Sequence, residues 1–437
     1  MKGRASVALG FLALILVGAV VLAMPFARAD GAWGDPVVSL FTACSAVCVT
    51  GLTVVEIAAE FSRAGQIVLL VLVEIGCLGL MTCGTFLLIA IGRRLSLARE
   101  FSLMNAYGVA QIQGLKGLIC WIVGSMLSLE FVGAAILYLR TGDVYRSLFY
   151  SAMGFCNAGF SVDPGSIAVF AGDPWIVLTL AAETILGGIG FLVLYNFCTC
   201  FLGRRRGAPR GRLSLHARVV LRLTLYLLAI TFVVFLAAEW NYALKSFDGL
   251  QRLWVAFYQA VTPRTCGFCI IPTESLRPFT RLFYEALMFV GGAPGSAAAG
   301  MKVTTFAVLV YTLLAMCRGE QETSLDHRVV PAEIVRESIV IFMALVGFIV
   351  LVTGALLLTE DMSVLSPDRL FFEAVSAVTT TGLSCGDTTA RLSFGGRCVV
   401  MVAMFIGRLG ALSVVMLIGD RESKRHVRFP AGELVVG

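Results

Sequence analysis

Charged side chains are scarce in this chain. Only 14% of its 437 residues are charged, whereas 58% are hydrophobic, and the mean hydropathy is +0.89. A soluble domain carries about a quarter of its residues charged, so this composition excludes an ordinary soluble protein and predicts an all-α integral membrane protein. The net charge of +6 therefore does not indicate a nucleic-acid partner, and we expect none.

Histidine is scarcer still. The only three are His216, His327 and His426, and all fall in stretches that we assign to the cytoplasmic side. A membrane-embedded enzyme with Cys48 or Cys266 as nucleophile would therefore lack a nearby base, which leaves it as a remote alternative. We do not expect the chain to be an enzyme.

The sequence also lacks the spacings of a metal or nucleotide site. The thirteen cysteines follow neither a zinc pattern nor a secreted disulfide framework, and most lie in apolar runs, where cysteine packs as a small hydrophobe. Cys198-x-Cys200 is a single pair without partners, so we predict no metal there. Residues 295–302 miss the phosphate-loop pattern by one residue, and we expect no bound cofactor.

The chain instead contains one unit repeated four times. A short step ending in glycine and a large apolar residue recurs at nearly equal intervals, with a phenylalanine before it and a second glycine after it, which indicates a fourfold internal repeat. We place the repeats at residues 1–97, 98–212, 213–327 and 328–437. The steps are Val49-Thr50-Gly51-Leu52, Asn157-Ala158-Gly159-Phe160, Thr265-Cys266-Gly267-Phe268 and Thr380-Thr381-Gly382-Leu383; the phenylalanines are Phe41, Phe149, Phe257 and Phe372, and the later glycines Gly79, Gly187, Gly295 and Gly410.

Each repeat has three parts. A first apolar run is long enough to span a bilayer, which takes about 20 residues. A semi-apolar segment of roughly a dozen residues is too short to span and predicts a re-entrant pore helix. A second long run closes the unit. The first runs lie near 7–24, 117–139, 217–238 and 338–358, the short segments are Val37–Cys48, Tyr145–Cys156, Leu250–Pro263 and Leu370–Thr379, and the second runs lie near 65–91, 175–201, 281–317 with an interruption, and 397–418.

Non-helical backbone inside a membrane is tolerated only where protein buries it or where it lines a watery cavity. The four short segments should therefore converge on one axis. The predicted fold has four repeats, each a transmembrane helix, a pore helix and a second transmembrane helix, giving eight transmembrane helices and four re-entrant pore loops around one central pore.

The first apolar run has a second interpretation. It follows Lys2 and Arg4 and ends in Ala27-Arg28-Ala29, which is also typical of a cleaved signal peptide. Cleavage would leave the first repeat without its leading helix, so we expect a retained transmembrane helix.

Lysine and arginine set the orientation. They gather at both ends of the chain and in the three connections between repeats, which predicts that both termini are cytoplasmic and that the pore loops enter from outside. The Arg204–Arg212 cluster fits this topology signal, and binding to anionic lipid or to a partner is the alternative.

The glycine steps have the chemistry of a cation filter. A pore helix directs the negative end of its dipole toward the membrane centre. Glycine lets the following turn present carbonyl oxygens, and rings of carbonyls replace water around potassium in potassium channels. Threonine hydroxyls either add oxygens or cap their pore helices. The predicted ion-binding residues, with potassium as the ion, are Val49, Thr50, Gly51, Asn157, Ala158, Gly159, Thr265, Cys266, Gly267, Thr380, Thr381 and Gly382.

These residues carry a family resemblance. The sequence resembles the Trk/Ktr/HKT superfamily of potassium transporters, and within it the KtrB type, because no extra pair of helices precedes the first repeat. The likeness covers all four repeats. Besides the glycine steps it rests on Arg264, on Gly291-Gly292-Ala293-Pro294-Gly295-Ser296, on Lys302-Val303-Thr304-Thr305-Phe306 and on Gly407-Arg408-Leu409-Gly410.

The resemblance implies a gate below the filter. Residues 291–300 would form a flexible intramembrane loop, and a small-residue run that contains proline does break a helix on physical grounds. The resemblance also implies multi-pass insertion in the plasma membrane, a homodimer and a cytosolic KtrA-like ring that binds ATP or ADP. The predicted gate residues are Gly291, Gly292, Pro294, Gly295, Ser296, Gly300, Lys302 and Arg408.

Arg408 is an arginine that lies near the centre of a predicted transmembrane span. An arginine within a span should face water, a carboxylate or carbonyl groups. One interpretation is an ion pair with Glu74 or Glu183; the other, implied by the resemblance, is a charge in the inner cavity beside the loop. Arg264 is expected to pair with a carboxylate, and Glu130 to be structural.

The predicted function is potassium uptake, regulated by a cytosolic nucleotide-binding partner. A sodium-selective or non-selective cation channel is the alternative. Cys266, Ala297-Ala298-Ala299 and Ala411 depart from the family pattern, which bears on selectivity and gating.

Overall fold

The computed structural model describes residues 2–79, 115–201, 213–326 and 328–410. Within these ranges the chain is almost entirely helical, and its sheet is one short hairpin of β1 (Ser324–Leu325) and β2 (Arg328–Val329). The predicted all-α fold is confirmed. The Arg204–Arg212 cluster, His327, Ala411 and His426 lie outside the described residues.

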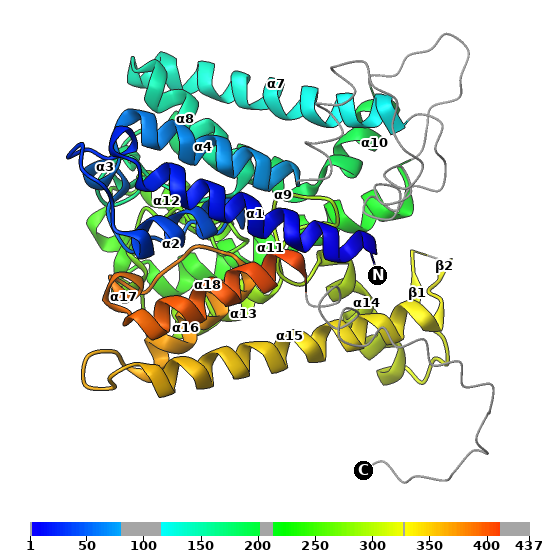
Figure 1. Ribbon diagram of the computed structural model, residues 1–437. Helices are drawn as coiled ribbons and strands as arrows, with labels where there is room; N and C mark the ends of the chain where they lie inside the picture. Colours follow the sequence, from blue (N-terminus) through cyan, green and yellow to red (C-terminus); the bar gives the residue numbers. More distant parts are fainter. Residues whose placement is uncertain (1, 80–114, 202–212, 327, 411–437) are drawn as a thin grey trace.

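The four predicted leading helices are present. They are α1 (Lys2–Ala23), α7 (Leu115–Thr141), α11 (Leu215–Glu239) and α15 (Ala332–Thr359). In Figure 1, α7 and α15 form opposite sides of the molecule, with shorter helices between them. Among the described residues, α7, α11 and α15 contain helices long and apolar enough to cross a membrane by themselves, and α9 with α10 forms a fourth if the bent pair counts as one span. The number of eight spans stays a prediction.

The four short segments form the helices α2 (Pro36–Val47), α8 (Val144–Cys156), α12 (Gln251–Val261) and α16 (Pro367–Thr379). Capping explains two of the starts. The Asp35 carboxylate accepts a hydrogen bond from the Val37 amide, and Asp143 accepts from the amides of Tyr145 and Arg146. Proline opens α2 and α16, where the missing amide proton costs nothing.

Two of the second runs are broken into two helices, and the described parts of the other two end at a glycine. The helices are α4 (Arg63–Leu78), α9 (Pro174–Ile189) with α10 (Phe191–Phe201), α13 (Pro278–Phe289) with α14 (Val303–Cys317), and α18 (Phe394–Leu409). The prediction of one continuous run over 175–201 is wrong: α9 and α10 meet at 97°. The break falls at Gly190, whose φ of +91° is costly for a residue with a Cβ. Gly79 and Gly410 end α4 and α18 with similar positive φ.

Short elements connect these helices. They are α3 (Ile57–Glu60), α17 (Thr388–Arg391) and the 3₁₀ turns η1 (Pro25–Ala27), η2 (Ala168–Phe170), η3 (Ala243–Ser246) and η4 (Thr273–Ser275).

Packing repeats the same pattern around the molecule. Within each unit the leading helix packs on its own short helix: α1 on α2, α7 on α8, α11 on α12 and α15 on α16. Between units the second helix contacts the next short helix: α4 contacts α8, α9 contacts α12, α13 contacts α16, and α18 returns to α2. The four units therefore close into a ring with the short helices inside it.

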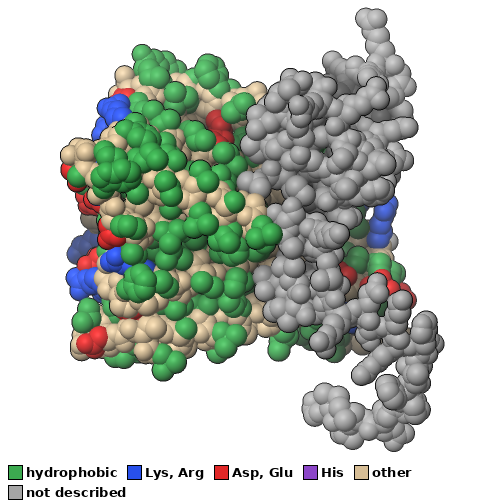
Figure 2. All heavy atoms as spheres, in the orientation of Figure 1, with side chains coloured by type: hydrophobic (Ala, Val, Ile, Leu, Met, Phe, Trp, Pro, Cys, Tyr) green, Lys and Arg blue, Asp and Glu red, His purple; other side chains and the backbone are tan. Residues whose placement is uncertain are grey.

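The outer surface suits a membrane. Large apolar side chains are exposed on the leading helices, including Phe131 and Leu139 on α7 and Leu351 and Leu358 on α15. In Figure 2 hydrophobic side chains are spread over the whole described face, and most of the charged side chains lie toward its left and right edges. An apolar area this wide, beyond the small patches of soluble monomers, is expected of a surface that faces lipid.

Candidate functional site

The four glycine steps share one backbone conformation. The residue two positions before each glycine has a left-handed φ: 56° at Val49, 57° at Asn157, 65° at Thr265 and 50° at Thr380. The glycines themselves have φ of 90°, 66°, 78° and 84° at Gly51, Gly159, Gly267 and Gly382. Left-handed backbone is rare for residues with a side chain and costs energy. Its presence in all four steps therefore indicates that each unit requires the same turn geometry.

These glycines and their neighbours form a closed ring. A Cβ added to Gly51 would lie 2.1 Å from the carbonyl oxygen of Ala158, and one added to Gly159 would lie 3.0 Å from that of Cys266. A Cβ on Gly267 would lie 3.0 Å from the Thr381 oxygen.

The contact from the fourth unit completes the ring. A Cβ on Gly382 would lie 1.9 Å from the Thr50 oxygen. Each glycine thus packs against the carbonyl of the next unit, and the fourth returns to the first. The predicted filter residues of all four units meet at one place.

Hydrogen bonds hold three of the turns in the same way. The amides of Thr50, Ala158 and Thr381 donate to carbonyls five residues earlier, at 2.8, 3.0 and 2.9 Å. This bond and the left-handed residue before it are the parts of a Schellman helix end. The third turn differs, because the Cys266 amide donates to the carbonyl of Thr262, four residues earlier, at 3.2 Å. Pro263 lies within this turn and has no amide proton to donate.

The threonine hydroxyls in and beside the steps divide into two groups. Thr379 Oγ1 donates to the Val375 carbonyl within α16 at 2.7 Å, and Thr265 Oγ1 donates to the Arg264 carbonyl at 2.7 Å. The hydroxyls of Thr50 and Thr380 are buried and have no protein partner. Those two remain candidates for contact with an ion or water.

Cys266 packs behind the ring. Its Sγ lies 3.3 Å from Thr184 Oγ1 and 3.4 Å from the Tyr258 hydroxyl, and the residue is fully buried. The thiol therefore replaces a small apolar group in the support of the third turn, while the carbonyl of Cys266 stays in the ring.

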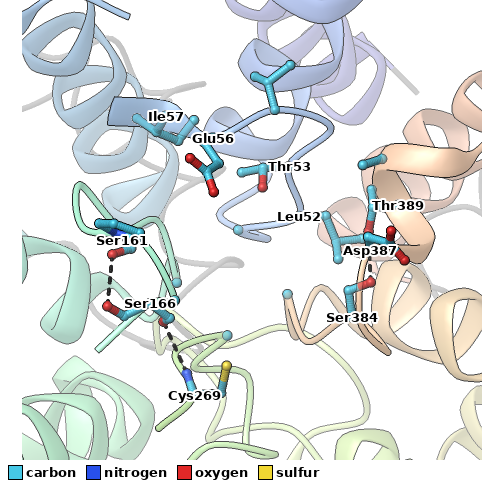
Figure 3. Close-up of a pocket in the computed structure, with 18 of the residues that line it drawn as sticks. Leu52, Thr53, Glu56, Ile57, Ser161, Ser166, Cys269, Ser384, Asp387 and Thr389 are labelled. Carbon is cyan, nitrogen blue, oxygen red and sulfur yellow. Dashed lines mark hydrogen bonds between the residues drawn. The ribbon is translucent and has the colours of Figure 1, made fainter. Parts of the chain in front are cut away.

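A cavity of about 840 Å³ opens on one side of the ring and is lined by all four step glycines. Figure 3 shows the side chains around it, with Glu56 and Asp387 among them. Asp163 also lines it and is paired with Arg146. Carboxylates at such a mouth raise the local concentration of cations.

The loop 291–300 lies between α13 and α14, as predicted, and hydrogen bonds fix its path. Its two ends pair with each other, since the Gly291 amide donates to the Met301 carbonyl at 2.9 Å. The Ala293 amide donates to the Gly188 carbonyl at 2.9 Å, and the Gly295 carbonyl accepts from the Phe191 amide at 3.1 Å. The loop therefore fills the break between α9 and α10.

Two cations bind successive carbonyls of this loop. Arg408 donates to the Ala297 carbonyl at 2.5 Å, and Lys302 donates through Nζ to the Ala298 carbonyl at 2.7 Å. The other arm of Arg408 donates to the Gly76 carbonyl on α4 at 2.6 Å. The loop of the third unit is thus tied through Arg408 to the second helices of the fourth and first units.

Arg408 therefore has carbonyl partners. Among the described residues, no carboxylate lies within ion-pair distance of it, which leaves its interpretation as an ion pair with Glu74 or Glu183 without support. Gly76 was not among the predicted residues. Gly76 and Gly407 lie at the same offset from their step glycines, and each packs against a carbonyl near the end of a short helix, Val47 and Val378 respectively.

The prediction that Arg264 pairs with a carboxylate is wrong. Within the described ranges Arg264 pairs with no carboxylate; its Nη2 donates to the Gly291 carbonyl at 3.5 Å, and its Nε is buried without a partner. The third turn lies beside the start of the loop, so main-chain oxygen is the acceptor within reach.

The sequence matches known proteins along nearly its whole length. The family described as "TrkH: Cation transport protein" matches residues 29–426. Ktr system potassium uptake protein B of Bacillus subtilis is 34% identical over 440 residues, which cover 98% of this chain and 96% of that protein. Potassium/sodium uptake protein NtpJ of Enterococcus hirae is 29% identical over 442 residues, covering 99% and 96%.

A solved structure agrees in fold. The crystal structure of the potassium transporter TrkH from Vibrio parahaemolyticus superposes with a TM-score of 0.77 at 18% identity, covering 95% of this chain and 84% of that one. Together with the ring of four units and the apolar exterior, these matches establish a membrane transporter and exclude an enzyme of the thiol class considered above. The chain belongs to the TrkH family of cation transport proteins.

Proposed function

We propose that this protein takes up potassium across the plasma membrane through the ring formed by its four glycine steps. The observation that carries the proposal is the closure of that ring, in which each glycine packs against the carbonyl of the next unit. Such a ring offers carbonyl oxygens from Thr50, Ala158, Cys266 and Thr381 around one axis. Carbonyl rings of this kind replace the hydration shell of potassium.

The surrounding helices favour a cation at the same place. The short helices α2, α8, α12 and α16 each end within four residues of the start of a glycine step, so the negative ends of their dipoles face the ring. The two buried, unpartnered hydroxyls of Thr50 and Thr380 add oxygen atoms at the first and fourth units. The names of two relatives specify potassium, and that of NtpJ specifies potassium or sodium.

The loop 291–300 is the gate in this proposal. Ion flow requires the loop to leave its place beside α9 and α10, and it is held there by Arg408 and Lys302. The same two side chains put positive charge on the path of a cation. Opening of the loop therefore breaks these hydrogen bonds and moves the two positive charges out of the ion path. Both changes cost energy, so the closed state is stable without a partner.

The orientation and assembly follow from the basic residues and from the relatives. Both termini are cytoplasmic, and the cavity with Glu56 and Asp387 faces outside. The repeats at 1–97, 98–212, 213–327 and 328–437 form one pore in each chain. Two relatives are named as parts of a Ktr system, which supports a transporter with a regulatory partner. We propose that the partner is a cytosolic KtrA-like ring that binds ATP or ADP and that this protein works with it as a homodimer.

Rubidium uptake into liposomes containing the purified chain tests this function. We expect uptake that potassium blocks and sodium does not. Equal block by both ions would favour the alternative, a non-selective cation channel, and block by sodium alone would favour a sodium pathway. Absence of uptake both with and without a KtrA-like partner would contradict the proposal.

A further inference from the structure

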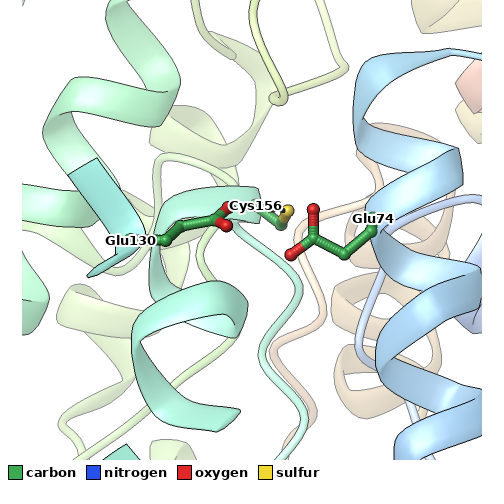
Figure 4. Close-up of side chains that lie close together, drawn as sticks. All are labelled: Glu74, Glu130 and Cys156. Atoms are coloured by element: carbon green, nitrogen blue, oxygen red, sulfur yellow. Dashed lines mark hydrogen bonds between the residues drawn. The ribbon is translucent and has the colours of Figure 1, made fainter. Parts of the chain in front are cut away.

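A cluster of acidic and thiol side chains lies outside the proposed ion path. It joins Glu74 on α4, Glu130 on α7 and Cys156 at the end of α8, with one donor atom from each residue within 4.8 Å of the others. In Figure 4 the carboxyl groups of Glu74 and Glu130 point toward each other, with the Cys156 thiol between them. The Cys156 thiol lies 3.9 Å from Glu130 Oε1.

The two carboxyl groups of the cluster have no ion-pair partner in the part of the chain that the structure describes. Among the residues that the structure describes, no lysine, arginine or histidine forms an ion pair with Glu74 or Glu130, and Glu130 is only 7% exposed. Two facing carboxylates in a membrane interior are unstable together unless a positive charge lies between them. The geometry therefore calls for a bound cation or proton.

A second observation points to the same interface. Glu183 on α9 is 4% exposed, and its Oε2 is buried without any hydrogen-bond partner. Its carboxylate fits between Gly133 of α7 and Gly154 of α8, where a Cβ on either glycine would meet it. Ser151 hydrogen-bonds to both Glu183 Oε1 and the Glu130 carbonyl. An unsatisfied carboxylate oxygen is thus held in the α7–α8 interface beside the cluster.

The donor set of the cluster is two carboxylates and one thiol from three helices. Zinc sites with three protein ligands and an open fourth position use carboxylate oxygen at about 2.0–2.2 Å and thiolate sulfur at about 2.3 Å. Sulfur ligands disfavour magnesium and calcium, which take oxygen alone.

We propose that Glu74, Glu130 and Cys156 form a binding site for a divalent cation of the zinc class. The ion neutralises the two facing carboxylates. It also fastens α4 of the first unit to α7 and α8 of the second. Cys156 directly precedes Asn157, so a bound ion would stiffen the second turn of the ring and slow ion flow.

Zinc binding to the full chain tests this directly. The purified, metal-stripped protein in detergent is titrated with Zn²⁺, and bound metal is counted after dialysis, for wild type, Glu130→Gln and Cys156→Ser. Cys385→Ser is the matched control, because Cys385 is also buried but lies in the fourth unit. We expect both test variants to lose one equivalent of Zn²⁺ and the control to keep it.

Two further readouts keep the test decisive if a variant folds poorly. Glu74→Gln changes a partly exposed member of the cluster and should weaken Zn²⁺ binding at least tenfold while the protein stays monodisperse. With Cd²⁺ as probe, a sulfur-to-metal charge-transfer band should appear in wild type and Cys385→Ser but shrink in Cys156→Ser. Equal Zn²⁺ binding in all variants, or no binding to wild type, would overturn the proposal whatever the result for rubidium uptake.

Discussion

Replacing Arg408 with alanine should open the pore. The change removes two hydrogen bonds of a charged donor, to Ala297 at 2.5 Å and to Gly76 at 2.6 Å. Bonds to charged groups contribute about 1.5–3 kcal/mol each, so losing even one shifts the balance between closed and open loop by about tenfold. We expect rubidium uptake by Arg408→Ala to rise about tenfold or more at equal protein in the liposomes.

A second variant separates the two roles of Arg408. Arg408→Lys keeps the charge, but a single ammonium group does not span the two carbonyls as the guanidinium fork does. If the hydrogen bonds hold the loop, the lysine variant should resemble alanine; if charge alone bars the path, it should resemble wild type. Unchanged uptake in a monodisperse Arg408→Ala protein would refute the reasoning.

Three other changes follow from the same geometry. Gly382→Ala should abolish uptake, because its Cβ would lie 1.9 Å from the Thr50 oxygen, whereas Gly347→Ala in open space on α15 should not; rubidium flux compares the two. Lys302→Gln should raise uptake less than Arg408→Ala, because Lys302 contacts only one loop carbonyl, and the same assay measures it. Asp143→Ala removes the cap of α8 and should cost about 1 kcal/mol, seen as a lower Tm with selectivity retained.

The ring was predictable from sequence because its determinants are local. A short apolar helix followed by a glycine step specifies both the helix and the turn that ends it, and four copies in order imply a common axis. The helices α2 and α8 accordingly begin and end within one residue of the predicted segments. α16 starts three residues earlier than predicted, at Pro367, because proline suits the first position of a helix.

The contacts of the loop were not predictable, because they depend on tertiary packing. α9 ends at Gly190, and the next amide, that of Phe191, donates to the Gly295 carbonyl of the loop, more than a hundred residues further on. A carboxylate was the expected partner of Arg264 and one of two interpretations for Arg408, yet both side chains donate to carbonyls of the loop. Nothing in a single sequence indicates which main-chain oxygen will lie nearby.

The cluster of Glu74, Glu130 and Cys156 was missed for a similar reason. Its members come from three helices of two repeats, with no spacing that resembles a metal motif. From the sequence, Glu130 was predicted to be a structural residue, and the cysteines in apolar runs were predicted to pack as small hydrophobes. The cluster exists only once α4 packs against α7 and α8.

The central claim is that the four carbonyls of the ring bind the transported ion. Anomalous scattering from crystals of the protein grown in rubidium tests it most directly. The account predicts a rubidium peak on the axis between the carbonyl oxygens of Thr50, Ala158, Cys266 and Thr381, which disappears when sodium replaces rubidium. A protein that transports rubidium yet has no peak within that ring would contradict it.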